Sequence, residues 1–261
     1  MMTDEQRFLF DLQGYLVVPG VLEPSTVERM RAEMEAHGVD PPEADSDAIT
    51  RCAGTRFGDF FRWCEEFRRL IDHSAILPIL AELLGPRFRL DHAYGMATRP
   101  KQTASASEGS TVPTLHHTAG MFENACFYLT HGNRIHNGLV TVSYALTDIA
   151  PGACGFCCIP GSHKAIFPMP RRLFLIEGNP WVRQIPQQAG DALIFTEALT
   201  HGTWPWSDPN GVRRSVLLKY APHYMQWGQQ PMDAGIEGLT ERQRLILMGA
   251  HVSRRPPIPE G

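Results

Sequence analysis

The chain has 261 residues, a net charge of -4 at pH 7, 43% hydrophobic residues and 20% charged residues, which is typical of a soluble globular protein. The acidic balance argues against binding to nucleic-acid polymers, and no apolar run approaches the length of a membrane span. The length fits one large domain, and the start of the chain lacks the layout of a signal peptide, so we expect a single-domain cytoplasmic protein.

Residues 1–86 are expected to be largely helical, with one early strand. Residues 14–18, Gly-Tyr-Leu-Val-Val, are followed by Pro-Gly and form a short apolar run that predicts a strand. Ser25 and Glu28 have the spacing of a capping box and predict the start of a helix. Residues 57–84 carry aromatic and leucine residues at intervals of three and four, which predicts a mostly helical stretch.

Residues 87–225 change to short strands separated by turns. Strand-like runs occupy residues 139–146, 192–195 and 215–220, as in a β-sandwich or barrel. Residues 101–114 are rich in Ser, Thr, Ala and Gly and predict a loop, either a lid over a site or an ordinary surface excursion.

The last part, residues 226–261, is expected to hold one helix and a tail. Thr240 and Gln243 form a second capping box, which predicts a helix through about Met248. A proline-rich stretch follows it. The order of elements is therefore helices first, a β-structure next and one helix last.

Two separated histidine segments and a later arginine suggest a metal site. His116 and His117 are adjacent, His201 follows a strand-rich stretch, and Arg213 comes twelve residues after His201. Two imidazoles and one carboxylate make the facial triad that holds non-haem Fe(II), and an arginine suits the far carboxylate of 2-oxoglutarate. The carboxylate normally lies two residues after the first histidine, at Thr118 or Ala119 in this chain. Neither residue is an acid.

Four stretches of the sequence resemble the phytanoyl-CoA dioxygenase family of Fe(II)/2-oxoglutarate oxygenases. They are residues 10–22, residues 155–164 (Gly-Phe-Cys-Cys-Ile-Pro-Gly-Ser-His-Lys), residues 190–202 and residues 213–215. The resemblance implies a double-stranded β-helix, or jelly roll, with helices before it and after it. It also implies that His201 and one of His116 and His117 bind Fe(II), and that Arg213 receives 2-oxoglutarate.

The chain departs from this family at the acid of the first motif. His116-x-Thr118 keeps a leucine before the ligand, whereas His117-x-Ala119 resembles the iron/2-oxoglutarate halogenases, in which a small residue leaves a coordination position for chloride. The resemblance implies an enzyme of secondary metabolism that uses Fe(II), 2-oxoglutarate and O2 to attack an unactivated C–H bond by a radical mechanism. The missing acid favours halogenation with chloride. Hydroxylation with water at that position is the alternative, and a non-catalytic jelly-roll binding protein is the rival from another class.

Several other side chains are candidates for binding the cosubstrate or the substrate. Arg214 neighbours Arg213, and one of the two must point away because neighbouring residues of a strand face opposite sides. Asn137 and Tyr144 are candidate polar contacts to cosubstrate or substrate, and Trp204 and Trp206 either line the substrate pocket or belong to the core. Four basic residues would suit an anionic small-molecule substrate if they were not simply solvated: Lys101, Arg134, Arg171 and Arg172.

Overall fold

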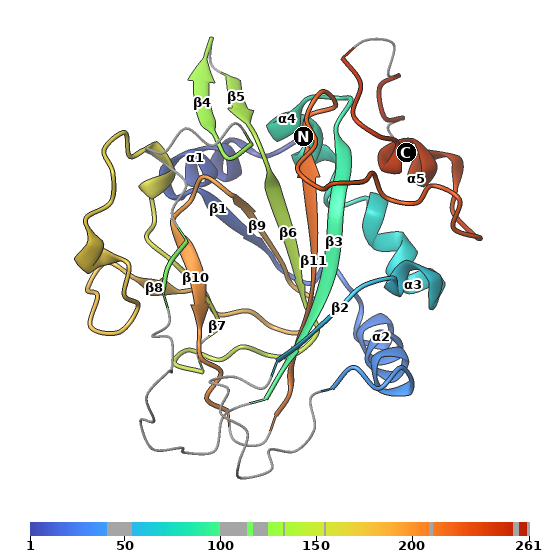
Figure 1. Cartoon of the computed structure of the whole chain (residues 1–261), viewed down its shortest axis with the longest axis horizontal. Coiled ribbons are helices and arrows are strands. Elements are labelled where there is room, and N and C mark those ends of the chain that lie inside the picture. The colour runs from blue at the N-terminus through green and yellow to red at the C-terminus, as the bar shows by residue number, and fades with distance from the viewer. Residues whose placement is uncertain are drawn as a thin grey trace.

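Two antiparallel sheets facing each other form the body of the protein (Figure 1). The structure is a computed structural model that describes residues 1–40, 54–99, 114–116, 125–132, 134–153, 155–208, 211–252 and 256–259. The larger sheet has six strands in the order β1-β9-β6-β11-β3-β2, and the smaller has three in the order β10-β7-β8. A separate hairpin pairs β4 with β5. This arrangement is the jelly roll that the sequence predicted.

The strands are mostly short, and the helices lie mainly in the first third of the chain. The strands are β1 (Tyr15–Val18), β2 (Gly54–Phe57), β3 (Arg89–Thr98), β4 (Tyr128–His131), β5 (Arg134–Asn137), β6 (Val140–Ala145), β7 (Gly155–Cys158), β8 (Arg183–Gln184), β9 (Ala192–Thr196), β10 (His201–Trp204) and β11 (Arg213–Ala221). The α-helices are α1 (Asp4–Gln13), α2 (Pro24–Ala36), α3 (Glu65–Arg69), α4 (Leu77–Leu84) and α5 (Glu241–Leu247). Among the described helices, none combines the length and the apolar character that a membrane span needs.

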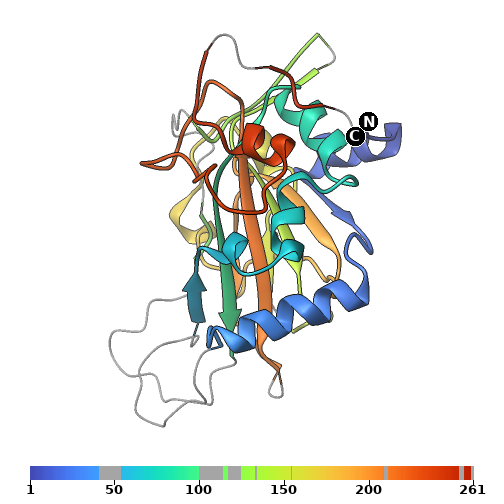
Figure 2. The same ribbon diagram turned by 90° about the vertical axis from the view of Figure 1, so that its right-hand side faces the viewer.

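The two faces of the large sheet have different neighbours. Successive strand residues point to opposite sides, and the even-numbered residues Val216, Leu218 and Tyr220 of β11 are fully buried in the main core with side chains from the helices. Figure 2 shows α2, α3, α4 and α5 on this outer side of the sheet. The odd-numbered residues of β11 consequently face the smaller sheet, across the interior of the jelly roll.

The predicted strands at 14–18, 139–146, 192–195 and 215–220 are present as β1, β6, β9 and β11, and the capping box of Thr240 and Gln243 is formed at the start of α5. The capping box predicted at Ser25 and Glu28 was wrong, although the helix itself is present. Helix α2 begins at Pro24 with Glu23 as its N-cap and no side-chain cap, because proline is well suited to the first turn. Residues 57–84 are largely helical as predicted, in the form of two short α-helices and two 3-10 turns that follow the end of β2. Most of the predicted loop at 101–114 lies outside the described residues.

The junction of α1 with the β-structure is fixed by His163, from the Pro-Gly-Ser-His stretch. Its Nε2 lies 3.1 Å from the Asp11 carbonyl and therefore carries the proton, and its ring packs edge-on against Tyr128 at 4.5 Å. Gly14 ends α1 with φ of +84°, and a Cβ there would lie 2.6 Å from His163 Nδ1. Both the left-handed backbone and the close approach of His163 explain why glycine occupies this position.

Stability should depend on pH through His163. Burial lowers the pKa of His163 to about 4, whereas an unfolded histidine titrates near 6.5. The unfolded chain therefore binds more protons between these values, and the free energy of unfolding falls as the pH drops from about 6.5 towards 4. The slope from this residue reaches about 1.4 kcal/mol per pH unit.

Urea unfolding at pH 7 and pH 5 measures this effect. We expect His163→Gln to lose less stability than the wild-type protein over that interval, because the amide does not titrate. Equal losses in the two proteins would show that His163 does not carry the dependence.

Candidate metal and 2-oxoglutarate site

His116 and His201 lie directly opposite each other on two antiparallel segments. The His116 amide donates to the His201 carbonyl at 2.5 Å, and the His201 amide donates to the His116 carbonyl at 3.1 Å. Residues paired in this way project their side chains to the same face, and the two imidazole ring centroids are 5.8 Å apart. The fold thus brings together two histidines that are 85 residues apart in the sequence.

The ring of His201 is held in one orientation and one tautomer. Its Nδ1 lies 2.7 Å from the Leu199 carbonyl, and because a carbonyl only accepts, Nδ1 must carry the proton. Phe195 and Phe156 pack on the ring at centroid distances of 4.8 and 5.7 Å. Burial lowers the pKa of His201 in spite of the nearby carboxylate of Glu197. His201 therefore presents a neutral imidazole with the lone pair on Nε2, as a metal ligand requires.

Arg213 is the first residue of β11 and is buried in the interior. Its guanidinium lies beside Gly155, the first residue of β7, where an added Cβ would come within 2.9 Å of Nη1. Gly155 pairs with Trp204 at the end of β10, the strand that His201 begins. Arg213 is an odd-numbered residue of β11 and therefore faces the interior, and its guanidinium lies at the end of β10 opposite to His201.

Arg214 is engaged elsewhere. Its Nε donates to the Asp40 carboxylate at 2.9 Å, and its Nη2 lies 3.4 Å from Glu35 on α2. These partners are on the outer side of the large sheet, opposite to Arg213. The alternation along β11 thus separates the two arginines that the sequence left as alternatives.

The sequence reasoning missed a largely buried acid, Glu197, which lies next to His201. Glu197 Oε2 is 3.8 Å from His201 Nε2, and Glu197 Oε1 accepts hydrogen bonds from Lys219 Nζ at 2.8 Å and from the Thr141 hydroxyl. Burial alone would raise the pKa of Glu197, but the Lys219 ammonium and these hydrogen bonds hold it below its usual range. The group is a carboxylate at neutral pH. The only sequence signal was its position four residues before His201.

Two further polar side chains lie beyond Lys219, the half-buried Tyr94 and the exposed Arg56. Tyr94 pairs with Leu217 across β3 and β11 and so shares the inner face with Lys219. The Arg56 guanidinium of β2 lies 3.8 Å from the centre of the Tyr94 ring, and Lys219 Nζ lies 5.9 Å from it. The interior thus offers cationic and hydroxyl groups on the wall opposite His201.

Three aromatic candidates turn away from this interior. Tyr144 is fully buried on the helix side of β6, where its hydroxyl donates to the Leu70 carbonyl at 3.3 Å. Trp204 packs with Leu115 and Cys157 on the outer face of the small sheet, since it is three residues from His201 on the same strand. Trp206 is buried, and its indole N–H donates to the Gly211 carbonyl at 2.9 Å. Tyr144 and Trp206 are thus core residues and Trp204 is half-buried against the core, which is the alternative to pocket contact that the sequence left open for the two tryptophans.

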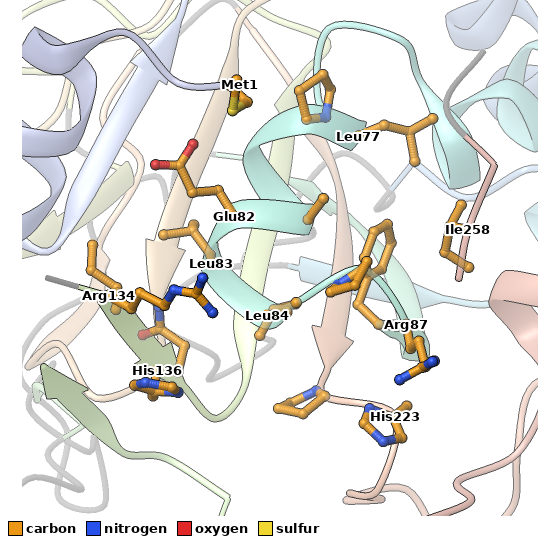
Figure 3. A pocket seen from close by; sticks show the side chains of 18 of the residues that line it. Met1, Leu77, Glu82, Leu83, Leu84, Arg87, Arg134, His136, His223 and Ile258 are labelled. Carbon is orange, nitrogen blue, oxygen red and sulfur yellow. The ribbon is translucent and has the colours of Figure 1, made fainter. Parts of the chain in front are cut away.

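Asn137 and Arg134 line a separate cavity. A cavity of about 1480 Å³ lies between α4 and β5, and Figure 3 shows Arg134 and His136 on one side of it and Leu83 and Leu84 on the other. Its lining includes neither of the two histidines of the candidate site nor Arg213. The structure therefore does not bring Asn137 or Arg134 to His201.

The remaining predicted residues do not enlarge the site. His117, Thr118, Ala119 and Lys101 lie outside the described residues. Arg171 and Arg172 are exposed in a short 3-10 turn. His116 is thus the member of the histidine pair that the described structure places beside His201.

Solved structures of metal-dependent enzymes share this architecture. HygX from Streptomyces hygroscopicus, with nickel and 2-oxoglutarate bound, is 27% identical to the chain, with a TM-score of 0.72 over 87% of this chain and 89% of that one. HygX with nickel, 2-oxoglutarate and hygromycin B bound is 26% identical, with a TM-score of 0.70 over 91% and 95% of the two chains. The non-heme alpha ketoglutarate dependent epimerase SnoN from nogalamycin biosynthesis is 25% identical, with a TM-score of 0.56 over 83% and 81%.

A comparison with curated protein sequences gives no match. The family model for phytanoyl-CoA dioxygenase (PhyH), in contrast, matches residues 10–213, which includes both histidine segments and ends on the interior arginine. The match covers most of the chain, and the fold is shared with structural relatives that hold a metal and 2-oxoglutarate. The chain belongs to the phytanoyl-CoA dioxygenase family, and it is an enzyme of the iron- and 2-oxoglutarate-dependent type.

Proposed function

We propose that the protein oxidises an unactivated C–H bond of a small polar molecule, with Fe(II) held by His116 and His201 and 2-oxoglutarate held by Arg213. The single observation that carries this proposal is the direct pairing of His116 with His201, whose ring centroids lie 5.8 Å apart. Iron, 2-oxoglutarate and O2, when bound, supply the oxidising power for removal of a hydrogen atom from the substrate.

The donor groups fit such a metal with a small adjustment. His201 already presents Nε2, and His116 is exposed, so its ring is able to turn towards His201. Within the described residues, no three His, Cys, Asp or Glu side chains are gathered closely enough to hold a metal ion. Binding would therefore draw the side chains together by a change in the orientation of His116.

Arg213 is suited to 2-oxoglutarate because guanidinium presents two parallel donors to a carboxylate. Gly155 leaves room for that guanidinium, and Phe156 and Phe195 exclude water from one side of the metal ligand His201. These residues would orient the cosubstrate, keep the imidazole neutral and limit the access of solvent.

The substrate class that we propose is a hydroxylated or glycosylated natural product. HygX is seen with hygromycin B, and SnoN comes from nogalamycin biosynthesis. This chain offers Tyr94, Arg56 and Lys219 as hydrogen-bonding groups, which would suit a polar molecule with many hydroxyl groups.

Halogenation of the C–H bond is a second candidate. One observation favours it, namely that Thr118 and Ala119 provide no carboxylate after either histidine. A site with only two protein ligands would leave a coordination position for chloride. The two candidates differ in the mass of the product formed at high chloride concentration.

Release of succinate from 2-oxoglutarate tests the proposal. We expect the protein with Fe(II), 2-oxoglutarate and O2 to release succinate in the presence of one of a panel of aminoglycoside and glycoside substrates. Addition of a chelator should stop this release. The product should be heavier than the substrate by one oxygen or lighter by two hydrogens. A chlorinated product would select the second candidate. Succinate at no more than the rate of free iron, from folded protein, would favour the non-catalytic binding protein and contradict the proposal.

A further inference from the structure

Glu197 places a carboxylate beside the proposed metal ligand His201. Its Oε2 lies 3.8 Å from His201 Nε2, the nitrogen that carries the lone pair. Metal–ligand bonds to nitrogen and carboxylate oxygen are about 2.0 to 2.2 Å long, so two ligands of one ion lie roughly 3 to 4 Å apart. The distance between the two atoms is thus already that of a pair of ligands on one metal.

The carboxylate is oriented by its other oxygen. Lys219 Nζ and the Thr141 hydroxyl both donate to Oε1, and these residues face each other across β11 and β6. Hydrogen bonds of this kind commonly fix a carboxylate that binds a metal through its remaining oxygen. They hold Glu197 so that Oε2 points to His201.

The ion pair with Lys219 uses one oxygen of the Glu197 carboxylate, and the other oxygen lies towards the imidazole. Lys219 Nζ donates to Oε1, whereas Oε2 lies 3.8 Å from His201 Nε2, and Nδ1 of the same ring donates to the Leu199 carbonyl. A cation between Oε2 and Nε2 would be held by both atoms.

We propose that Glu197 is the third protein ligand of the metal, completing with His116 and His201 a two-histidine, one-carboxylate set in which the acid comes four residues before the second histidine. This inference rests on the proposed function. It also predicts which product forms, because a carboxylate on the metal fills the position that chloride would need. The enzyme would then oxygenate or dehydrogenate its substrate without chlorinating it.

Metal affinity tests the assignment without reliance on turnover. Anaerobic calorimetric titration with Co(II) is applied to the wild-type protein and to Glu197→Gln, with Glu123→Gln as the matched control, since Glu123 is the first acid after His116 in the sequence. Loss of an outer partner of a metal ligand costs roughly 10- to 100-fold in affinity. We therefore expect Glu197→Gln to weaken Co(II) binding by more than about 100-fold and Glu123→Gln to leave it unchanged.

A rescue variant separates a ligand from a merely structural residue. In Glu197→Gln with Thr118→Asp, the acid returns to the position two residues after His116, and we expect most of the Co(II) affinity to return. Because Glu197→Gln leaves Lys219 without its carboxylate, the double variant Glu197→Gln with Lys219→Met is tested as well, with circular dichroism to verify the fold. A folded double variant should still bind Co(II) weakly.

Wild-type Co(II) affinity in the folded Glu197 variants would overturn the assignment, as would loss of affinity in Glu123→Gln alone. If His201→Ala binds poorly in the same experiment, the proposed function stands while the role of Glu197 fails. If His201→Ala also binds as tightly as the wild-type protein, the metal site itself is wrong.

Discussion

Replacing His201 should remove metal binding and turnover together. Its Nε2 is presented by a hydrogen bond from Nδ1 to the Leu199 carbonyl, and no other described histidine is paired across strands with His116. Loss of an outer partner of a ligand already costs roughly 10- to 100-fold, so loss of the ligand itself should weaken Co(II) binding by more than about 100-fold.

His201→Phe is the sharper variant, because it keeps an aromatic ring between Phe195 and Phe156 while removing both nitrogens. His136→Ala serves as the control, since His136 is exposed on β5 and lies in the lining of the separate cavity. Calorimetry with Co(II) measures the affinities, and thermal unfolding verifies the fold. Tight binding by folded His201→Phe would exclude this histidine as a ligand.

The second large effect is expected at Arg213. Arg213→Met should raise the dissociation constant of 2-oxoglutarate by more than about 100-fold, because a charge-assisted bidentate hydrogen bond is lost from a buried site and each 1.4 kcal/mol is a factor of ten. Arg213→Lys should recover only part of the affinity, since an ammonium group does not offer the planar pair of donors.

Arg214→Met is the matched control, one residue further along the same strand. It should leave the affinity for 2-oxoglutarate unchanged and lower the free energy of unfolding by about 1 to 3 kcal/mol, because Asp40 and Glu35 lose their partner. Calorimetric titration with 2-oxoglutarate and urea unfolding measure the two quantities. The reverse pattern, with 2-oxoglutarate binding lost in the Arg214 variant, would exchange the roles of the two arginines.

Local sequence signals predicted the strands well and the helices less well. The apolar runs of β1, β6, β9 and β11 are short and buried on at least one face, and their composition alone indicates strands. Residues 57–84 have helical spacing throughout, yet they form several short elements, the first of which pack Phe60, Phe61 and Phe67 together in the core. Such breaks depend on tertiary packing, which periodicity does not report.

The alternation of strand residues could have improved the site prediction. Trp204 lies three residues after His201 on β10, so the two side chains point to opposite faces of the strand. Tyr144 lies three residues after Thr141 on β6, and these two side chains also point to opposite faces. The choice between Arg213 and Arg214, in contrast, needed the position of Asp40 on the helix side. That position is set by packing and not by local sequence.

Glu197 illustrates a site residue that sequence reasoning alone could not assign. Its relation to His201 depends on the turn between β9 and β10, and its partners Lys219 and Thr141 come from two other strands. A motif search for an acid after the first histidine looks in the wrong segment if the carboxylate comes from this turn. Only the register of β6, β9 and β11 places the acid beside the imidazole.

Binding of 2-oxoglutarate to the metal-loaded protein tests the central claim most directly. Calorimetric titration of 2-oxoglutarate is performed without oxygen, once with Fe(II) and once with a chelator. Saturable binding with one site per chain is expected only when Fe(II) is present, and it should be absent in His201→Phe and strongly weakened in Arg213→Met. Binding that is equally tight without metal, or no binding by folded wild-type protein with Fe(II), would contradict the assignment of this interior as an iron and 2-oxoglutarate site.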